Sequence, residues 1–311
     1  MATKTVPTIL KTLLFLLVII LSLDTIQSKP KKHKAFEFLE HLKGCHKGQN
    51  VSGLHELKQY LEKFGYFQTS NPHGNDDEFD EVLESAIKTY QQNYHLEVTG
   101  SLDSETVKQM MMPRCGIPDF INGTSTSRHQ SHHHHHNRKL IHRVSLYSFF
   151  DGAPRWTKSH LTYRFRSSVP APTQNIRSIC ARAFEKWSQV SHFTFEEVSE
   201  TSQADIEIGF HSGNHGDSDP FDGPLGTLAH AFAPTNGRLH FDAEENWSEN
   251  PGQNQVDLES VAVHEIGHVL GLYHEPSIPD AIMYPSFNYG ITKRNLHADD
   301  IQGIRALYGL N

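Results

Sequence analysis

Basic residues, cysteines and long hydrophobic runs are all scarce in this 311-residue chain. From residue 147 onward it carries 21 acidic but only 11 basic side chains, which argues against nucleic-acid binding and suits a domain that holds cations. Its three cysteines cannot all pair in disulfides, so at least one thiol has another fate. Histidine, with 23 residues, is the abundant type whose placement needs an explanation.

The only long hydrophobic run is Leu13–Leu23, and it follows Lys4 and Lys11. Its eleven residues are too few to span a bilayer comfortably, so we interpret residues 1–28 as a secretory signal peptide, with a single-pass anchor as the alternative. No second apolar stretch follows, and the C-terminal residues lack the hydrophobic tail of a GPI signal. We therefore expect a secreted, extracellular protein without a stable membrane anchor.

Three N-glycosylation triplets begin at Asn50, Asn122 and Asn246. Such triplets are weak indicators on their own, but they agree with export from the cell. The three asparagines are therefore candidate glycosylation sites.

Residues 29–119 are predicted to form a small all-helical domain. Between residues 33 and 112, three stretches place apolar side chains three and four positions apart, as one face of a helix requires. Glycines and a polar stretch separate them. A fourth, short helix is expected after Asp103 or Ser104, either of which is a suitable N-cap.

Residues 120–146 are polar, lack periodicity and include five consecutive histidines, His132–His136. Such a composition is typical of an exposed, protease-accessible linker. A weak metal-sequestering role is the alternative for the histidine run.

Residues 147–311 mix strand and helix patterns, which favours an α+β domain. Short stretches with strand character lie at residues 161–165, 193–198, 204–210, 226–233 and 238–242, and helical stretches lie at residues 173–190, 255–272 and 297–309.

The helical stretch 255–272 carries a zinc-binding pattern. His264 and His268 are four residues apart, so both imidazoles project from one face of the helix. Gly271 can adopt a positive φ and turn the chain, so that His274 supplies a third zinc ligand. Glu265 reaches the zinc-bound water rather than the metal, which is the position of a general base. The spacing predicts a hydrolytic zinc site.

The segment MMPRCGIPD, residues 111–119, gives Cys115 a role. A thiolate is a strong zinc ligand, so Cys115 can fill the open position of the zinc and displace the water. Arg114 can pair with a carboxylate and hold the segment in place. We interpret residues 29–119 as an inhibitory prodomain that ends in a cysteine switch.

These motifs together resemble those of the matrixins, the matrix metalloproteinases of the metzincin clan. The pattern H-E-x-x-H-x-x-G-x-x-H is followed by a methionine turn at Met283, and the segments FDGPLGTLAHAF and DDIQGIRALYG also match. The chain is most similar to the short plant type without a hemopexin domain. The resemblance implies a twisted five-stranded sheet with three helices, a mature N-terminus near Tyr147, and a methionine packed beneath the zinc.

The resemblance also implies two further metal sites. A structural zinc is expected on four side chains of the C-terminal domain, and His211 is a nearby rival expected to be exposed. A calcium ion is expected on carboxylates and backbone carbonyls, whereas Arg238 in place of a carboxylate puts a second calcium site with Asp205 in doubt. The zinc ligands are His215, Asp217, His230 and His240, and the calcium ligands are Asp222, Gly223, Leu225, Thr227, Asp242 and Glu245.

An extended peptide or protein is the expected substrate. In matrixins the edge strand, here with Leu228 and Ala229, pairs with the substrate backbone. Ser260 and Phe287 would line an S1′ pocket, for which we predict a preference for large hydrophobic P1′ residues such as leucine.

Two other classes of function remain open beside a monomeric, zymogen-forming zinc endopeptidase. One is a wall-binding module, because the helical prodomain resembles peptidoglycan-binding folds. The other is a histidine-rich metal buffer. Glu265 argues against the wall-binding module, since a structural zinc needs no general base, and the metal buffer predicts metal binding by His132–His136 without peptidase activity. Cys180 is expected to be a buried thiol, and Cys45 either a free thiol or linked to Cys180.

Overall fold

The computed structural model describes residues 35–67, 76–120 and 147–310. The predicted signal peptide, the histidine run His132–His136 and the triplet at Asn122 lie outside these residues. Among the described residues, no helix has both the length and the apolar character that crossing a membrane requires.

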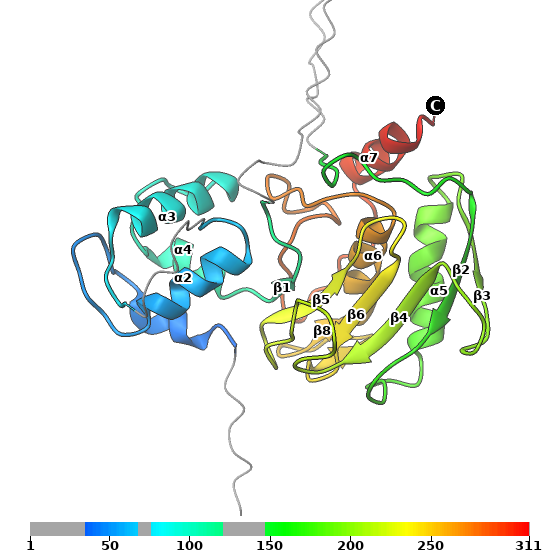
Figure 1. Cartoon of the computed structure of the whole chain (residues 1–311), viewed down its shortest axis with the longest axis horizontal. Coiled ribbons are helices and arrows are strands. Elements are labelled where there is room, and N and C mark those ends of the chain that lie inside the picture. Colours follow the sequence, from blue (N-terminus) through cyan, green and yellow to red (C-terminus); the bar gives the residue numbers. More distant parts are fainter. Residues whose placement is uncertain (1–34, 68–75, 121–146, 311) are drawn as a thin grey trace, which may run out of the picture. The chain divides into compact units, whose positions relative to one another are not determined.

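The N-terminal part is all-helical, as predicted (Figure 1). Its core consists of side chains between Phe36 and Met110, with Tyr284 added from the C-terminal domain. Asp103 accepts the Thr106 N–H and is therefore the N-cap, so Ser104 is the first helical residue. The elements are a 3-10 helix η1 (Glu37–Leu42) and helices α2 (Leu54–Lys63), α3 (Glu81–Asn93) and α4 (Ser104–Met110).

The C-terminal domain contains the five predicted strands in one sheet. The strand order is β5-β6-β4-β2-β3, and only β5 runs antiparallel to its neighbour. A sixth strand at the β5 edge, β1 (Arg114–Cys115), comes from the N-terminal part. The bounds are β2 (His160–Phe165), β3 (Thr194–Glu197), β4 (Ile206–His211), β5 (Thr227–Ala231) and β6 (Arg238–Asp242).

Three helices accompany the sheet, as expected: α5 (Ile176–Ser188), α6 (Leu258–Val269) and α7 (Ala298–Tyr308). Figure 1 shows α5 and α6 on the same side of the sheet. Every residue of α6 is buried, so this helix lies in the middle of the core. The α+β prediction is confirmed, while the domain boundaries at residues 119 and 147 stay predictions.

Two details differ from the sequence prediction. A short parallel pair, β7 (Trp247–Ser248) and β8 (Val256–Asp257), was not predicted, because two-residue strands carry no periodicity. Cys45 and Cys180 are free buried thiols in separate hydrophobic clusters, so a disulfide between them is wrong.

Candidate active site and metal centres

Helix α6 presents the first two histidines of the predicted zinc site. The Asp257 carboxylate accepts the Ser260 N–H and begins the helix. Past its end, Gly271 has φ +102°, and an added Cβ would meet the Pro154 carbonyl. This glycine turns the chain so that His274 returns toward the helix.

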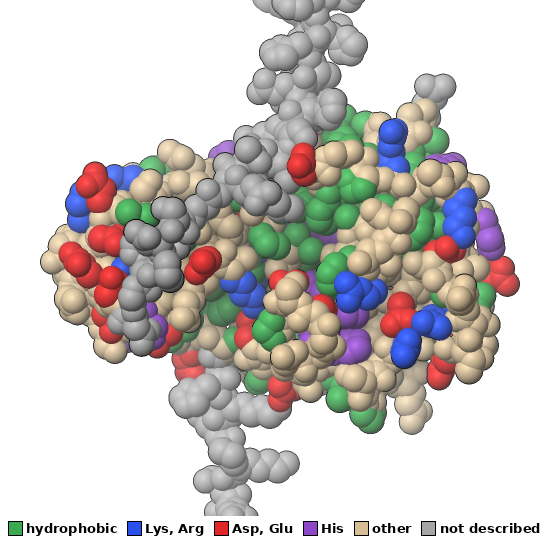
Figure 2. Space-filling view, viewed as in Figure 1, with side chains coloured by type: hydrophobic (Ala, Val, Ile, Leu, Met, Phe, Trp, Pro, Cys, Tyr) green, Lys and Arg blue, Asp and Glu red, His purple; other side chains and the backbone are tan. Residues whose placement is uncertain are grey.

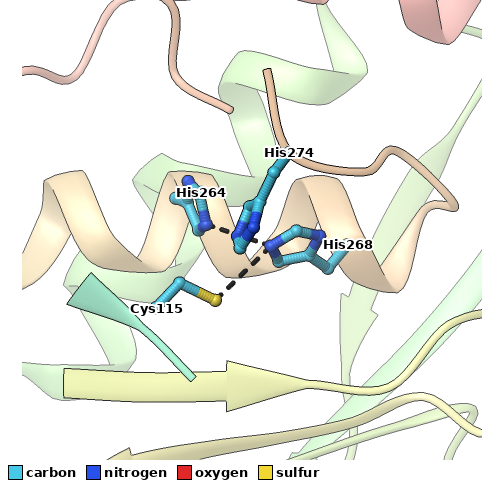
Figure 3. Close-up of side chains that lie close together, drawn as sticks. All are labelled: Cys115, His264, His268 and His274. Carbon is cyan, nitrogen blue, oxygen red and sulfur yellow. Dashed lines mark hydrogen bonds between the residues drawn. The ribbon is translucent and has the colours of Figure 1, made fainter. Parts of the chain in front are cut away.

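Four side chains converge at this point (Figure 3). Cys115 Sγ lies 3.5 Å from His268 Nε2, and the Nε2 atoms of His264 and His268 are 3.0 Å apart. With His274, one potential ligand atom from each residue lies within 4.8 Å of every other. All four side chains are buried, and the arrangement fits a tetrahedral zinc ion.

The outer nitrogens of the three imidazoles all have oxygen acceptors. His264 Nδ1 is 2.7 Å from the Ile282 carbonyl, and His268 Nδ1 is 2.9 Å from the Leu272 carbonyl. These contacts leave each Nε2 for a metal, and His274 Nε2 is buried without a hydrogen-bond partner among the described residues. Burial and mutual repulsion lower the pKa of His264 and His268, which favours the neutral, metal-binding ring.

Glu265 lies on α6 beside this cluster and is fully buried. Among the described residues its carboxylate oxygens have no nitrogen or oxygen donor. Burial raises the pKa of Glu265 to about 8, although a hydrogen bond with the Cys115 thiol acts to lower it. A buried carboxyl group with a pKa near neutrality is suited to accept and return a proton.

Met283 packs against α6 at Gly267. An added Cβ on Gly267 would clash with its sulfur, so the glycine permits this close approach. The Met283 N–H donates to Asp300 Oδ1 at 3.1 Å, which fixes the turn. The position agrees with a packing role beneath the histidines.

The segment around Cys115 lies in the cleft as an added strand. Cys115 N–H donates to the Pro285 carbonyl at 2.9 Å, and Gly116 N–H donates to the Ala229 carbonyl at 2.8 Å. Gly116 has no room for a side chain, because an added Cβ would lie 2.7 Å from Thr227 Cγ2. The prodomain thus occupies the strand edge predicted to bind substrate.

Asp119 is the carboxylate that pairs with Arg114, and the sequence did not identify it. Its two oxygens lie 2.7 and 3.0 Å from the guanidinium nitrogens, and both side chains are buried. The same carboxylate accepts Tyr66 and Tyr94 hydroxyls and lies 2.9 Å from His274 Nδ1. The prodomain therefore contacts a candidate zinc ligand through Asp119 as well as offering Cys115.

The second predicted zinc cluster is also assembled. Asp217 Oδ2 lies 3.0 Å from the Nε2 atoms of His215 and His230 and 2.9 Å from His240 Nδ1. Histidine side chains gather on the molecular face over β5 and β6 (Figure 2). Three imidazoles and one carboxylate match a closed zinc site.

His211 is not exposed as expected. Its ring stacks on His215 with centroids 4.9 Å apart, and its Nδ1 is 2.9 Å from Ser168 Oγ. His211 is the last residue of β4, and the strand places its ring beside the cluster. The spacing of the histidines in the sequence did not reveal this position. It lies outside the four-residue ligand group.

The predicted calcium ligands lie together as well. Asp242 and Glu245 are nearly fully buried, and Asp242 Oδ2 and Glu245 Oε2 have no hydrogen-bond partner among the described residues. Burial and neighbouring carboxylates raise the pKa of Asp242 to about 6 and that of Glu245 to about 8. Gly223 and Leu225 both have positive φ, so the loop Asp222–Thr227 is sharply turned. The donor set fits a hard divalent cation.

Asp205, the carboxylate of the doubtful second calcium site, already has other partners. Asp205 accepts Lys158 Nζ at 2.6 Å and Thr162 N–H at 2.8 Å. The Arg238 guanidinium, which cannot ligate calcium, lies 3.9 Å from the centre of the Phe232 ring. Among the described residues these contacts already satisfy Asp205.

A cavity of about 520 Å³ lies in the region expected for the S1′ pocket, and its lining also includes the prodomain residues Lys108 and Gln109. Ser260 and Phe287 line it, and the Phe287 ring is 5.3 Å from the His264 ring. Lys293, which the sequence did not single out, also lines it, with Nζ 5.2 Å from the Tyr284 ring centre. Burial lowers the pKa of Lys293 to about 8, so the cavity is of mixed polarity.

The two glycosylation candidates within the described residues are both exposed. Asn50 forms an isolated bridge with Glu78, and Asn246 Nδ2 donates to the Asn254 carbonyl. Their exposure is compatible with modification.

Comparisons with known proteins agree with this geometry. The matrixin family model matches residues 155–309, and a putative peptidoglycan-binding domain model matches residues 50–110. Metalloendoproteinase 1 of Glycine max is 48% identical over 274 residues, covering 86% of this chain and 85% of that protein. Metalloendoproteinase 2-MMP of Arabidopsis thaliana is 45% identical, with 86% and 74% covered. Stromelysin-1 of Mus musculus is 37% identical, with 83% and 50% covered.

Proposed function

The chain belongs to the matrixin family of zinc metalloendopeptidases and carries a zymogen-type prodomain, and on this premise we propose a secreted endopeptidase held latent by Cys115. The observation that carries the proposal is the arrangement around α6. Three imidazoles and one thiol converge, and the buried Glu265 carboxylate beside them has no nitrogen or oxygen donor among the described residues.

The three histidines His264, His268 and His274 would hold the catalytic zinc. When bound, zinc acts as a Lewis acid that acidifies a water and polarises the peptide carbonyl. The carbonyl groups of Ile282 and Leu272 accept from the outer nitrogens of His264 and His268 and so hold these two rings in a metal-binding orientation.

Glu265 is proposed as the general base and then the general acid. Its carboxylate accepts a proton from the attacking water and returns it to the leaving amine as the peptide bond breaks. In the prodomain-bound chain this carboxyl group is buried beside the histidines, and departure of the Cys115 segment would open it to the attacking water.

Latency is proposed to depend on the position of Cys115. Its sulfur lies beside the three histidines, where it would take the zinc position that a water needs, and the flanking backbone hydrogen-bonds to Pro285 and Ala229. Removal of the prodomain frees both the metal position and the strand edge for an extended peptide. The P1′ side chain would enter the cavity beside Ser260 and Phe287, with preference for large hydrophobic residues.

Two further metal sites belong to the proposal. A structural zinc would bind the cluster of His215, Asp217, His230 and His240, and calcium would bind the loop Asp222–Thr227 with Asp242 and Glu245. Secretion rests on the predicted signal peptide at residues 1–28 and agrees with the exposed glycosylation candidates Asn50 and Asn246.

The test is cleavage of a quenched peptide with leucine at P1′. The full-length protein, the protein trimmed by proteolysis near residue 146, and the trimmed Glu265→Ala variant are compared, with zinc content measured for each. We expect activity only after trimming and its loss in Glu265→Ala with zinc retained. An inactive trimmed protein with full zinc and calcium occupancy would contradict catalysis and favour the wall-binding alternative.

A further inference from the structure

Lys63 links the prodomain to the candidate calcium loop. It is the last residue of α2, and its Nζ lies 3.2 Å from Asp222 Oδ2 and 2.7 Å from Thr227 Oγ1. Asp222 and Lys63 are partly exposed, with 25% and 31% of their side-chain surface accessible. A prodomain ammonium group therefore rests on a carboxylate expected to bind calcium.

Two backbone hydrogen bonds join the prodomain to the same loop. Ala35 N–H donates to the Pro224 carbonyl at 3.1 Å, and Arg114 N–H donates to the Gly226 carbonyl at 3.0 Å. An added Cβ on Gly226 would lie 2.5 Å from Ala35 Cβ, so the two chains are closely packed here. Three separate prodomain segments thus contact the loop outside the zinc cleft.

The position of Lys63 is set by the same segment that holds the cysteine switch. The next residue, Phe64, lies under the Arg114 guanidinium at 3.7 Å and accepts the Asp119 N–H through its carbonyl. A movement of the switch segment is therefore transmitted to the end of α2 and to the Lys63 contact.

The other two carboxylates of the site have a different environment. Asp242 Oδ2 and Glu245 Oε2 are buried and lack hydrogen-bond partners among the described residues, so a cation would satisfy them. Asp222 is the member of this trio that already has a cationic partner, supplied by the prodomain. A nearby ammonium group also repels a divalent ion.

We infer that the loop Asp222–Thr227 is a second docking surface for the prodomain, where Lys63 and calcium compete for Asp222. This inference rests on the calcium site of the proposed function. The zymogen then binds calcium more weakly than it would without Lys63. By linkage, the factor by which prodomain docking lowers the calcium affinity is also the factor by which calcium weakens prodomain docking. Rising calcium therefore favours activation.

The experiment measures calcium affinity by titration calorimetry on the full-length zymogen with the Glu265→Ala substitution, which prevents autolysis. Lys63→Met is compared with Lys63→Arg, which keeps the charge, and with Lys47→Met. Lys47 pairs with Glu81 and Glu84 in the helical unit and is the matched control. We expect roughly fivefold tighter binding or more for Lys63→Met, and no change for the other two.

The reciprocal measurement follows the reaction of the Cys115 thiol with an alkylating reagent, read by peptide mapping. Calcium should speed the reaction in the Glu265→Ala zymogen and have little effect in its Lys63→Met form. Equal calcium affinities in the Lys63→Met and reference zymogens would overturn the competition. Absence of calcium binding in every form, including the trimmed protein, would instead remove the calcium site itself, while peptide hydrolysis would still test the zinc site.

Discussion

The two histidine clusters of this chain use similar side chains but are assembled differently. The cluster on α6 takes three histidines from the C-terminal domain and its fourth member, Cys115, from the prodomain. The cluster around Asp217 takes all four members from the C-terminal domain. A ligand that belongs to a removable segment makes the first cluster switchable, whereas the second stays closed when the prodomain leaves.

The two clusters also differ in the charge of their side chains. The second contains a carboxylate: burial opposes its ionisation, but the Asp219 N–H and the histidines outweigh burial and hold the pKa of Asp217 at about 2. The first has no carboxylate among its ligands, and the Glu265 carboxylate stands beside it without a nitrogen or oxygen donor among the described residues. A zinc site whose four positions are all filled by lasting protein ligands is typical of a structural role. A site with one removable ligand and a carboxylate beside it is suited to catalysis.

The largest expected effect comes from removing one histidine from each cluster. His268→Ala should abolish peptide hydrolysis in the trimmed protein, by about a thousandfold or more, because the general base then lacks its metal partner. His230→Ala should instead lower the melting temperature while the folded fraction keeps most of its activity. Zinc content should fall from two equivalents to one in both.

Activity assays and thermal melts on the two variants, at matched zinc concentration, distinguish these outcomes. If His230→Ala lost activity as completely as His268→Ala while remaining folded, the division between a catalytic and a structural cluster would be wrong.

The next effect in size is the release of latency by Cys115→Ala. Without the thiol, the switch segment loses its tie to the metal position and should leave the strand edge more often, so the uncleaved protein should hydrolyse the leucine peptide at least about a hundredfold faster than the wild-type zymogen. Cys180→Ala is the matched control, because Cys180 is an equally buried thiol on α5. Gel analysis must show that the chain is intact during the assay.

A smaller effect is expected from Asp119→Asn. This change breaks the buried ion pair with Arg114 and weakens the contact with His274, and removal of one partner of such a pair costs about 3–5 kcal/mol. Part of this cost falls on docking, so the Cys115 thiol should react about tenfold faster with an alkylating reagent. An unchanged reaction rate would mean that Asp119 does not hold the switch segment.

Local patterns made the first cluster predictable from sequence. His264, Glu265 and His268 lie within one helix, where spacing fixes direction, and Gly271 indicates the turn that brings in His274. The second cluster needed the family resemblance, because residues 215, 217, 230 and 240 come from a loop and two strands.

What sequence reasoning missed depends on contacts between distant segments. Asp119 as the partner of both Arg114 and His274, Lys63 at Asp222, and Lys293 in the cavity all join residues far apart in the chain, where no periodicity operates. His211 was wrongly expected to be exposed to solvent. The direction of its side chain follows from the register of β4, which the sequence did not determine.

A third metal site, built from oxygen ligands alone, sharpens the contrast with Asp217. Burial raises the pKa of Glu245 to about 8, so the folded, calcium-free protein holds a proton that the unfolded chain has released above about pH 4.5. The stability from this proton is complete below about pH 4.5 and is lost as the pH rises through 8. Between pH 6 and 8 the loss should be about 2 kcal/mol, or roughly 5 °C in melting temperature for a domain of this size.

Calcium should remove this pH dependence, because a divalent ion replaces the proton as the partner of the carboxylates. The measurement is the melting temperature of the trimmed protein at pH 6 and pH 8, in zinc-containing buffer with and without calcium. Without calcium, Glu245→Gln should lose most of the difference between the two pH values, since its side chain does not titrate, and Asp242, whose pKa burial raises to about 6, should leave a smaller one. A calcium-free wild-type protein whose melting temperature does not fall between pH 6 and 8 would show that Glu245 is ionised and paired like Asp217, and the distinction between the two carboxylates would disappear.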